Sequence, residues 1–286
     1  MSSPITVWDE EVGVEYFKHK YVCITGGSSG IGLEAACKLA ACGAHVAIFG
    51  REEKRLQTAR KKIEAAGISP EQSIYTLSMD ISDHADVEKK IARAVQEFGV
   101  PDILINSAGM GHADYFEQVT YDIFDQVIRT NLYGTRNVIA ALVPFMKTRG
   151  GHIVNVSSMI GLIGLFGYST YGASKFALVG FSECLRMDLK RYNIHVSVFC
   201  PPEVDTPMTD LMLKTSPPES RALVKMTGLM RAEKAADALL KGIQKKNFLI
   251  IPGYMANNSY FYKRVFPALT RLVMDMVVAR ASRKIK

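Results

Sequence analysis

The chain has 286 residues, 48% of them apolar and 22% charged, a composition that predicts a folded protein with a buried core. Its N-terminus lacks the basic and apolar regions of a secretory signal, and no stretch approaches the roughly 20 uncharged apolar residues that cross a bilayer. Most of the net charge of +7 lies in residues 256–286, which carry seven basic side chains and one acid, so we expect no nucleic-acid-binding face.

Apolar runs alternate with helical patterns along almost the whole chain. The runs that we expect to form strands lie at residues 21–24, 45–49, 74–77, 103–105, 152–156, 196–199 and 248–251. The helical patterns lie at 31–41, 52–65, 124–146, 173–192 and 232–242, with one more after Ser82 and Asp83. This alternation requires right-handed crossovers and a parallel sheet covered by helices on both faces. The expected fold class is therefore α/β, a single-domain Rossmann-type doubly wound sheet of about seven strands.

No internal repeat, low-complexity block or linker divides the chain. We therefore expect one domain over residues 1–252 and a C-terminal helical appendage over residues 253–286. The five cysteines are odd in number and lack the spacing of a metal site, and they are Cys23, Cys37, Cys42, Cys184 and Cys200. Reduced thiols, no bound metal and a cytoplasmic location are the expectations that follow.

A glycine-rich loop joins the first expected strand to the first expected helix, and it reads TGGSSGIG over residues 25–32. Gly26 permits a tight turn, Gly30 lets the backbone approach a pyrophosphate, and Gly32 allows the helix to pack closely on the strand. Glycines in a row can also form an ordinary loop, but the strand–turn–helix context favours dinucleotide binding at the helix start. The contacts expected here are Gly26, Ser28, Ser29, Gly30, Ile31 and Gly32.

The end of the second expected strand indicates which dinucleotide is bound. A site that prefers NAD places an acid there to bind the ribose 2′-hydroxyl. This chain instead reads Phe49-Gly50-Arg51, so the acid is missing and a guanidinium follows. Arg51 can pair with a 2′-phosphate, together with Ser28, which predicts NADPH (NADP) as the cofactor. The alternative is a solvated Arg51 that pairs with Glu52 or another neighbour.

Tyr171 and Lys175 lie four residues apart at the start of an expected helix. This spacing places both side chains on one face, a turn apart. A phenol has an ordinary pKa of about 10, and a neighbouring ammonium lowers that pKa. The pair is a candidate proton donor, although the same spacing is common on helix surfaces.

Three further motifs accompany this pair. They are the Thr-Gly-x-x-x-Gly-x-Gly loop, Asn106-Ser107-Ala108-Gly109 after the fourth strand, and Ser158, thirteen residues before Tyr171. With these motifs in this order, the chain resembles the short-chain dehydrogenase/reductases over about residues 20–251. The resemblance implies an NADPH-dependent enzyme that transfers hydride between a nicotinamide and a C=O or CH–OH group.

The resemblance also implies a role for each matching residue. Tyr171 would donate the proton to the carbonyl oxygen, and Ser158 would hydrogen-bond that oxygen. Lys175 would lower the tyrosine pKa and hold the nicotinamide ribose, while Asn131 would hold a water in the proton relay. The remaining cofactor contacts that it implies are Asp80, Ile81, Asn106, Ala108, Gly109, Tyr171, Lys175, Pro201, Val204 and Thr206. These roles suit the chemistry, because hydride transfer leaves negative charge on the substrate oxygen.

One stretch departs from the family pattern. After the sixth strand the family usually has Pro-Gly, whereas residues 200–207 read CPPEVDTP. Pro202 restricts φ and removes a backbone donor, so we expect a stiffer loop beside the nicotinamide. This string and GLFGY at 164–168 resemble the 3-ketosphinganine (3-ketodihydrosphingosine) reductase branch of the family. That branch reduces a long-chain β-keto amine with NADPH, and methionine-rich residues 211–230 suit such a greasy substrate.

The tail combines apolar and basic residues. On a helical wheel one face holds Val265, Phe266, Leu269, Leu272, Val273 and Met276. Aromatic residues 260–262 precede this face and basic residues follow it, which suits a peripheral contact with the cytoplasmic face of a membrane. The same helix could instead pack on its own domain, cover the substrate cleft or join a partner subunit.

The leading hypothesis is an NADPH-dependent carbonyl reductase of a long-chain ketone, with 3-ketosphinganine as the best single substrate. A broader ketone or hydroxysteroid-type oxidoreductase would use the same residues. A non-catalytic NADPH-binding regulatory protein or membrane-associated scaffold would not need Tyr171. The family often pairs helices around residues 119–146 and 172–192, which implies a homo-oligomer.

Overall fold

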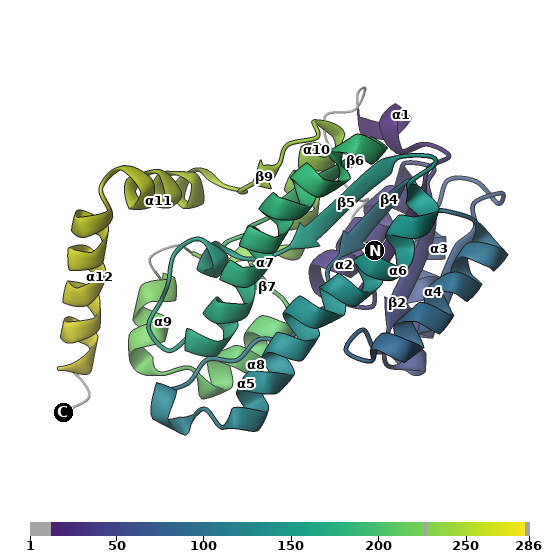
Figure 1. Ribbon diagram of the computed structural model, residues 1–286. Coiled ribbons are helices and arrows are strands. Elements are labelled where there is room, and N and C mark those ends of the chain that lie inside the picture. The colour runs from purple at the N-terminus through teal and green to yellow at the C-terminus, as the bar shows by residue number, and fades with distance from the viewer. Residues whose placement is uncertain (1–12, 226–227, 284–286) are drawn as a thin grey trace, which may run out of the picture.

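The computed structural model describes residues 13–225 and 228–283 (Figure 1). Seven strands pair in parallel into one sheet in the order β3-β2-β1-β4-β5-β6-β9. They are β1 Tyr21–Thr25, β2 His45–Gly50, β3 Ile74–Ser78, β4 Ile103–Asn106, β5 Gly151–Val156, β6 Ile194–Phe199 and β9 Leu249–Ile250. The doubly wound seven-stranded sheet expected from the sequence is confirmed.

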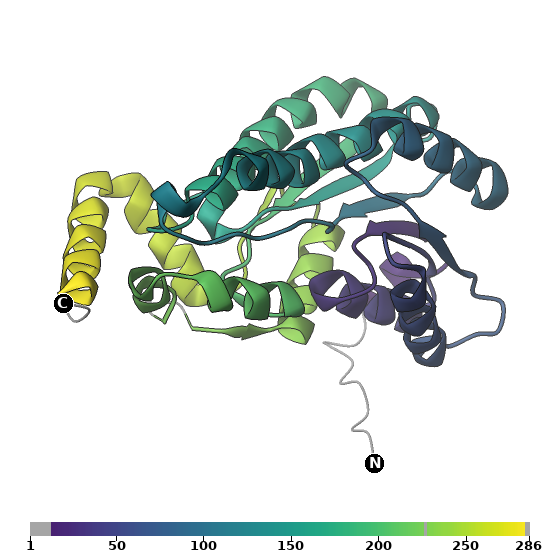
Figure 2. The same cartoon turned by 90° about the horizontal axis from the view of Figure 1, so that it is seen from below.

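Helices cover both faces of this sheet. They are α1 Gly13–Phe17, α2 Gly30–Ala41, α3 Glu53–Ala66, α4 His84–Phe98, α5 Tyr121–Ile128, α6 Thr135–Met146, α7 Ser169–Leu189 and α10 Ala232–Gln244. Short 3₁₀ turns lie at Phe116–Gln118, Met159–Gly161 and Lys190–Tyr192. Seen from below in Figure 2, the teal helices α6 and α7 lie on one side of the strands, and the purple α2 and yellow-green α10 lie on the other.

The two faces bury two separate apolar clusters. Alternate residues of β1 point to opposite faces, as the pleat of a strand requires. Val22 and Ile24 pack with residues of α2, α3 and α10. Tyr21 and Cys23 pack with residues of α4, α6 and α7. Burial on both faces explains why these strands read as continuous apolar runs in the sequence.

Two local features differ from the expected elements. The helical region expected at 124–146 is interrupted by a π-helical segment, Arg129–Gly134, that joins α5 to α6. Helix α7 begins at Ser169 rather than at Ala173, because the N–H of Gly172 bonds to the carbonyl of Tyr168 at 2.6 Å.

The segment between β6 and α10 holds four elements that the sequence did not predict. They are β7 Val204–Asp205, α8 Pro207–Thr215, α9 Pro218–Lys225 and β8 Met230–Arg231. Strands β7 and β8 pair in parallel as a second small sheet. The Thr206 hydroxyl accepts from the N–H of Thr209 at 3.3 Å and caps α8. This segment lies beside the carboxyl ends of the strands.

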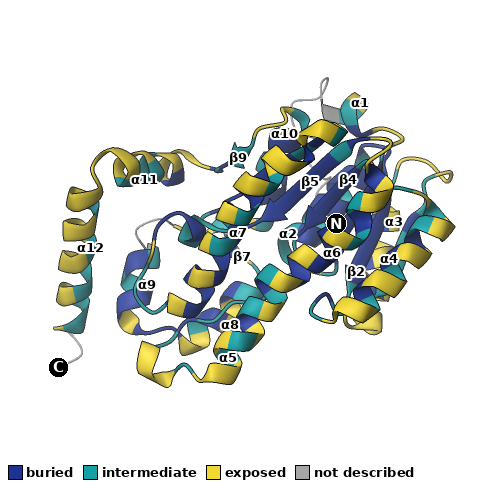
Figure 3. Ribbon diagram, viewed as in Figure 1, coloured by how far each residue is buried: buried dark blue, intermediate teal, exposed yellow. Residues whose placement is uncertain are grey.

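The appendage forms two helices, α11 Tyr254–Val265 and α12 Pro267–Ser282. Helix α12 contacts α9, and the Ser282 hydroxyl donates to Glu219 at 2.8 Å. Its inward face includes Met274, which packs against the cluster around Leu162. The apolar face expected from the helical wheel instead lies in solvent, as the yellow and teal colouring of Figure 3 shows.

The domain boundary at residues 252 and 253 stays a prediction. Residues 1–12 of the expected first domain lie outside the described residues, as do residues 284–286 of the appendage. Within the described ranges, no helix is both long and apolar enough to cross a membrane.

Candidate active site

A cleft of about 480 Å³ lies at the carboxyl ends of the parallel strands. The structure brings most of the expected site residues into its lining. These are Gly26, Ser28, Ser29, Gly30, Ile31, Arg51, Asp80, Ile81, Ala108, Gly109, Ser158, Tyr171, Lys175, Pro201, Val204 and Thr206. Three expected residues, Gly32, Asn106 and Asn131, are not among the lining residues.

The glycine loop makes the close approaches that were expected of it. Gly26 adopts φ +69°, and a Cβ there would lie 2.7 Å from the backbone of Ala108. A Cβ on Gly32 would lie 2.5 Å from the carbonyl oxygen of Gly26. Gly32 therefore acts by letting α2 pack on the loop, which explains why it is absent from the lining.

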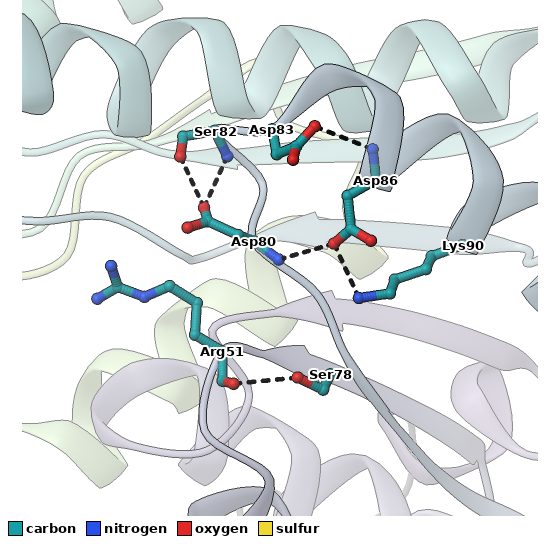
Figure 4. Close-up of polar contacts among 7 residues, drawn as sticks. All are labelled: Arg51, Ser78, Asp80, Ser82, Asp83, Asp86 and Lys90. Carbon is teal, nitrogen blue, oxygen red and sulfur yellow. Dashed lines mark hydrogen bonds and ion pairs between the residues drawn. The ribbon is translucent and has the colours of Figure 1, made fainter.

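Arg51 lines the cleft, and its guanidinium makes no ion pair with the described residues. Its backbone carbonyl accepts from the Ser78 hydroxyl at 3.0 Å, as Figure 4 shows. Glu52, the alternative partner, pairs with Arg55 at 3.0 Å. Arg55 also lines the cleft, and sequence reasoning missed it because it lies within an ordinary charged helix.

Asp80 is held at the rim by a turn of hydrogen bonds (Figure 4). Its Oδ1 accepts from the N–H of Ser82 at 2.9 Å and from the Ser82 hydroxyl at 2.7 Å. Its own N–H donates to Asp86, which Lys90 neutralises at 2.8 Å. Asp83 caps α4 by accepting from the N–H of Asp86 at 3.0 Å, so the helix start fixes this corner of the cleft.

Tyr171, Ser158 and Lys175 converge in the cleft. The Ser158 hydroxyl is hydrogen-bonded to Tyr171 and accepts from the N–H of Ile160 at 3.2 Å. The Lys175 Nζ lies 5.5 Å from the Tyr171 ring centroid and donates to the carbonyl of Val156 at 2.9 Å. The neighbouring Ser157 donates instead to the Lys175 carbonyl at 3.0 Å, so the thirteen-residue spacing selected the serine that touches the phenol.

Burial controls the ionisation of this trio. It raises the pKa of Tyr171 well above its ordinary value, and the hydrogen bond with Ser158 opposes that rise. It lowers the pKa of Lys175 to about 8. The expected lowering of the Tyr171 pKa by Lys175 stays a prediction, because in the chain by itself desolvation of the phenol is the dominant effect. The raised pKa keeps the phenol protonated near neutrality, which is the form that can donate a proton.

Asn131 and Asn106 lie behind the cleft wall. The Asn131 side-chain oxygen accepts from the N–H of Met110 at 2.8 Å. The Asn131 side-chain nitrogen donates to the carbonyl of Met110 and to the hydroxyl of Ser174, each at 2.9 Å. These bonds tie the π-helical segment to the 107–111 loop, and the water relay stays a prediction. Asn106 donates to Asn155 at 2.9 Å across β4 and β5, and its expected cofactor contact stays a prediction.

The other side of the cleft is apolar. Its lining includes Met110, Met159, Ile160, Leu165, Tyr168, Met208, Leu211, Met212 and Val224. In the segment between β6 and α10, which we call the covering segment, Leu211 and Met212 line the cleft as expected. Leu229 is exposed instead, and Met230 belongs to β8. Met226, expected with them, lies outside the described residues. Sequence reasoning also missed Glu203, whose place in the lining depends on the path of its loop.

The family model described as short chain dehydrogenase matches residues 20–216. The 3-dehydrosphinganine reductase of Danio rerio is 38% identical over 230 residues, which cover 80% of this chain and 69% of that protein. The 3-ketodihydrosphingosine reductase of Bos taurus is 37% identical with the same coverage. The probable oxidoreductase EphD of Mycobacterium tuberculosis is 33% identical over 90% of this chain and 45% of that protein.

Solved structures share the fold. Levodione reductase has a TM-score of 0.74 and 25% identity, covering 82% of this chain and 96% of that chain. A short chain dehydrogenase from Burkholderia cenocepacia, solved in complex with NADP, has a TM-score of 0.75 and 22% identity, covering 90% and 98%. Together with the family match over residues 20–216, these findings show that the chain belongs to the short chain dehydrogenase family and is an oxidoreductase acting on a carbonyl or hydroxyl group.

Proposed function

We propose that the protein is an NADPH-dependent reductase of a long-chain ketone and that 3-ketosphinganine is its substrate. The observation that carries this proposal is the convergence of the Tyr171 phenol and the Ser158 hydroxyl beside an apolar cleft wall. The names of the relatives from Danio rerio and Bos taurus support the choice of substrate.

The phenol and the hydroxyl have complementary tasks in the proposed reaction. Bound NADPH supplies a hydride to the carbonyl carbon. Tyr171 gives its hydroxyl proton to the carbonyl oxygen, so hydride and proton together produce the alcohol. Ser158 already accepts from the N–H of Ile160, which leaves its O–H to donate to the oxygen as negative charge develops. The Lys175 Nζ lies 5.5 Å from the centroid of the Tyr171 ring, where its positive charge would stabilise the phenolate that this transfer leaves.

The residues present fit NADPH. The start of α2 has no side-chain cap at Ser29, so in this proposal its N–H groups bind the pyrophosphate. The guanidinium of Arg51 is suited to a 2′-phosphate, with Ser28 near Gly50 on the same side of the cleft. Asp80 and Ile81 at the rim provide the expected position for the adenine.

The apolar wall fits a long hydrocarbon chain. Tyr171 packs in a cluster with Ala113, Tyr168 and Met212, all of them buried. Partly buried residues extend this cluster along the cleft, and they are Ile160, Leu165, Met208 and Val224. Unbranched methionines adapt to a flexible chain, so this wall can bind an acyl tail next to the proton donor.

NADPH oxidation by the purified protein tests the proposal. The substrates are 3-ketosphinganine and a short-chain ketone, with NADH as the alternative cofactor and Tyr171→Phe as the control. We expect rapid turnover of 3-ketosphinganine with NADPH, and loss of that turnover in the variant. Turnover of short-chain or steroid ketones alone would refute the sphingolipid assignment. Cofactor binding without any turnover would favour a non-catalytic protein.

We further propose that α11 and α12 contact the cytoplasmic face of an anionic membrane. Large apolar side chains of these helices lie in solvent, and they are Tyr254, Met255, Phe261, Tyr262, Val265, Phe266, Leu269, Leu272, Val273 and Met276. Residues 254–283 also carry five basic side chains and one acid. Apolar side chains beside cations suit the interface of an anionic bilayer.

Flotation with vesicles tests this contact. We expect binding to phosphatidylserine-containing vesicles, weaker binding to neutral ones, and loss of binding in Leu269→Asp/Leu272→Asp. Ile68→Asp is the control, because Ile68 is an exposed apolar residue outside α11 and α12, and this variant should still bind the vesicles. If the double variant instead changes the subunit count and vesicles never bind, the surface is a subunit interface.

Exposed apolar residues also support the proposal of a homo-oligomer. Tyr121, Tyr133, Phe176 and Met187 lie in solvent on α5, on the π-helical segment and on α7. These are the segments that the family often pairs. Light scattering during size-exclusion chromatography should therefore show a multiple of the 31.6 kDa chain, and Met187→Glu should reduce it. A monomeric native protein would refute this pairing.

A further inference from the structure

Glu203 lies in the loop that follows β6 and lines the cleft. Its carbonyl accepts from the N–H of Met230 at 2.9 Å, which ties the loop to the start of β8. Pro201 and Pro202 precede it, and they restrict the loop backbone. The side chain is therefore carried on a stiff, anchored segment, and neither the proposed proton transfer nor the proposed cofactor contacts use it.

The Glu203 carboxylate has no partner that would explain its burial. Its Oε1 is inaccessible and makes no hydrogen bond among the described residues. The ion pairs of the described residues do not include it either, and Lys175, the buried cation of the same cleft, donates to Val156. Partial burial also raises the pKa of this carboxyl above its ordinary value. A carboxylate oxygen that is inaccessible and has no partner is costly, so a ligand that offsets the cost is expected.

Glu203 lines the same cleft as the proton donor Tyr171 and its neighbour Tyr168. Its negative charge raises the pKa of both Tyr168 and Tyr171, which places it within electrostatic reach of the proton donor. A cation bound to Glu203 would thus sit close to the carbonyl that Tyr171 protonates. Only a substrate with a cationic group near its carbonyl can make both contacts at once.

We propose that Glu203 binds the ammonium group of an amino ketone and so selects amino ketones over neutral ketones. The inference rests on the proposed function and deepens it. In 3-ketosphinganine the ammonium is on the carbon beside the carbonyl, so one short segment of the substrate reaches both Glu203 and Tyr171. The hydrocarbon chain then lies against the wall formed by Tyr168 and Met212. An ammonium–carboxylate hydrogen bond is charge-assisted, and so it is stronger than one between neutral groups.

A pair of matched substrates tests the role of Glu203. One is 3-ketosphinganine, and the other is the same 1-hydroxy-3-ketone without its amino group. For Glu203→Gln, we expect kcat/KM for the amino ketone to fall about 10- to 100-fold. The neutral ketone and the Kd of NADPH should change less than about twofold. Asp205→Asn is the matched control, because Asp205 is an exposed carboxylate two residues away that does not line the cleft.

The pH dependence gives a second readout. Because the pKa of Glu203 is raised, its carboxylate protonates at a higher pH than an ordinary glutamate would. In the wild type, kcat/KM for the amino ketone should therefore fall as the pH falls through this range, relative to the neutral ketone. The ratio of the two substrates should be flat with pH in Glu203→Gln.

Equal losses for both ketones, or weaker NADPH binding, would overturn the assignment and place Glu203 in cofactor or loop positioning. A wild type that reduces neither ketone would refute the proposed function. In that case a binding experiment tests the ammonium site of Glu203 by itself. Sphinganine and the matched long-chain alcohol would be titrated into the NADP-bound protein. Tighter binding of the amine that disappears in Glu203→Gln would sustain the ammonium site. Equal binding of the two would refute it.

Discussion

The two ends of the parallel strands carry different kinds of charged groups. At the carboxyl ends, the cleft of about 480 Å³ holds the buried Lys175, the partnerless Oε1 of Glu203 and the guanidinium of Arg51, which makes no ion pair with the described residues. At the amino ends, a cavity of about 190 Å³ is lined by Asp102 and His152 among others.

At the amino ends Asp102 and His152 have partners within the protein, although the Nδ1 of His152 is buried without a hydrogen bond among the described residues. The Asp102 carboxylate accepts from the N–H of Tyr21 at 2.8 Å and lies 3.5 Å from Arg149. The His152 Nε2 lies 2.7 Å from the Ser197 hydroxyl. Groups left without a partner at the carboxyl edge are available to a ligand at a cost in stability, whereas the bonds of Asp102 and of the His152 Nε2 at the amino edge serve the fold. Variants at the two edges should therefore separate activity from stability.

The largest expected effect is that of Tyr171→Phe. Removing the proton donor should lower kcat by about 10³-fold, because general acid catalysis contributes on that order. The phenyl ring keeps the packing with Tyr168 and Met212, so thermal unfolding should be unchanged. Steady-state kinetics and a thermal melt check both. A large fall in melting temperature would contradict the comparison, since the carboxyl edge would then support the fold.

Lys175→Met should reveal the cost of burying a cation. The pKa of Lys175 is about 8 in the folded chain and about 10.4 when unfolded, so the unfolded state binds more protons between these values. Wild-type stability should thus rise with pH in this window by at most about 1.4 kcal/mol per pH unit, relative to the variant. Urea unfolding at pH 7, 8, 9 and 10 measures the slope. Parallel curves for the two proteins would refute it.

Arg51→Ala should weaken NADPH binding by about tenfold and leave NADH binding unchanged, because only NADPH carries the 2′-phosphate. Fluorescence titration with both cofactors measures this. Arg60→Ala is the control, since Arg60 is an exposed arginine of α3 that pairs with Glu64 at 2.7 Å. Equal losses for both cofactors in Arg51→Ala would show that Arg51 does not read the 2′-position.

The smallest expected effect is at the amino edge. Burial lowers the pKa of His152 to about 3, so between about pH 6.5 and 3 the unfolded chain binds a proton that the folded chain does not. Wild-type stability should fall with acid in this window, by at most about 1.4 kcal/mol per pH unit relative to His152→Gln. Unfolding from pH 7 to 5 measures the slope, and kcat at pH 7 should be unchanged. A lower kcat in the variant would contradict the expectation that the amino edge affects stability and not activity.

Sequence reasoning was most accurate where the signal is local. The strands were found because burial on both faces makes them continuous apolar runs. Ser158, Tyr171 and Lys175 were found because their spacing is a property of one strand end and one helix. The net rise in the Tyr171 pKa was missed, because burial depends on residues far apart in the chain.

The remaining errors arose where tertiary contacts determine the outcome. Nothing in the sequence of residues 203–231 shows that β7 and β8 pair, because two-residue strands carry no pattern. Arg55 and Glu203 have ordinary neighbours, and only the folded loops bring them to the cleft. The helical wheel identified the apolar face of the tail but left open whether this face packs on the domain or is exposed. In the structure α12 contacts α9, and the apolar face lies in solvent.

The pairing of β7 with β8 has a consequence for how this enzyme can change. Val204 pairs with Met230 and Asp205 with Arg231, so the two ends of the covering segment are clasped together. Loop length adds little to the cost of closing a segment whose ends already meet. The segment between these two strands is thus closed at its base. Insertions or replacements within it are expected to change the range of substrates, while the sheet and α7 keep the proton donor in place.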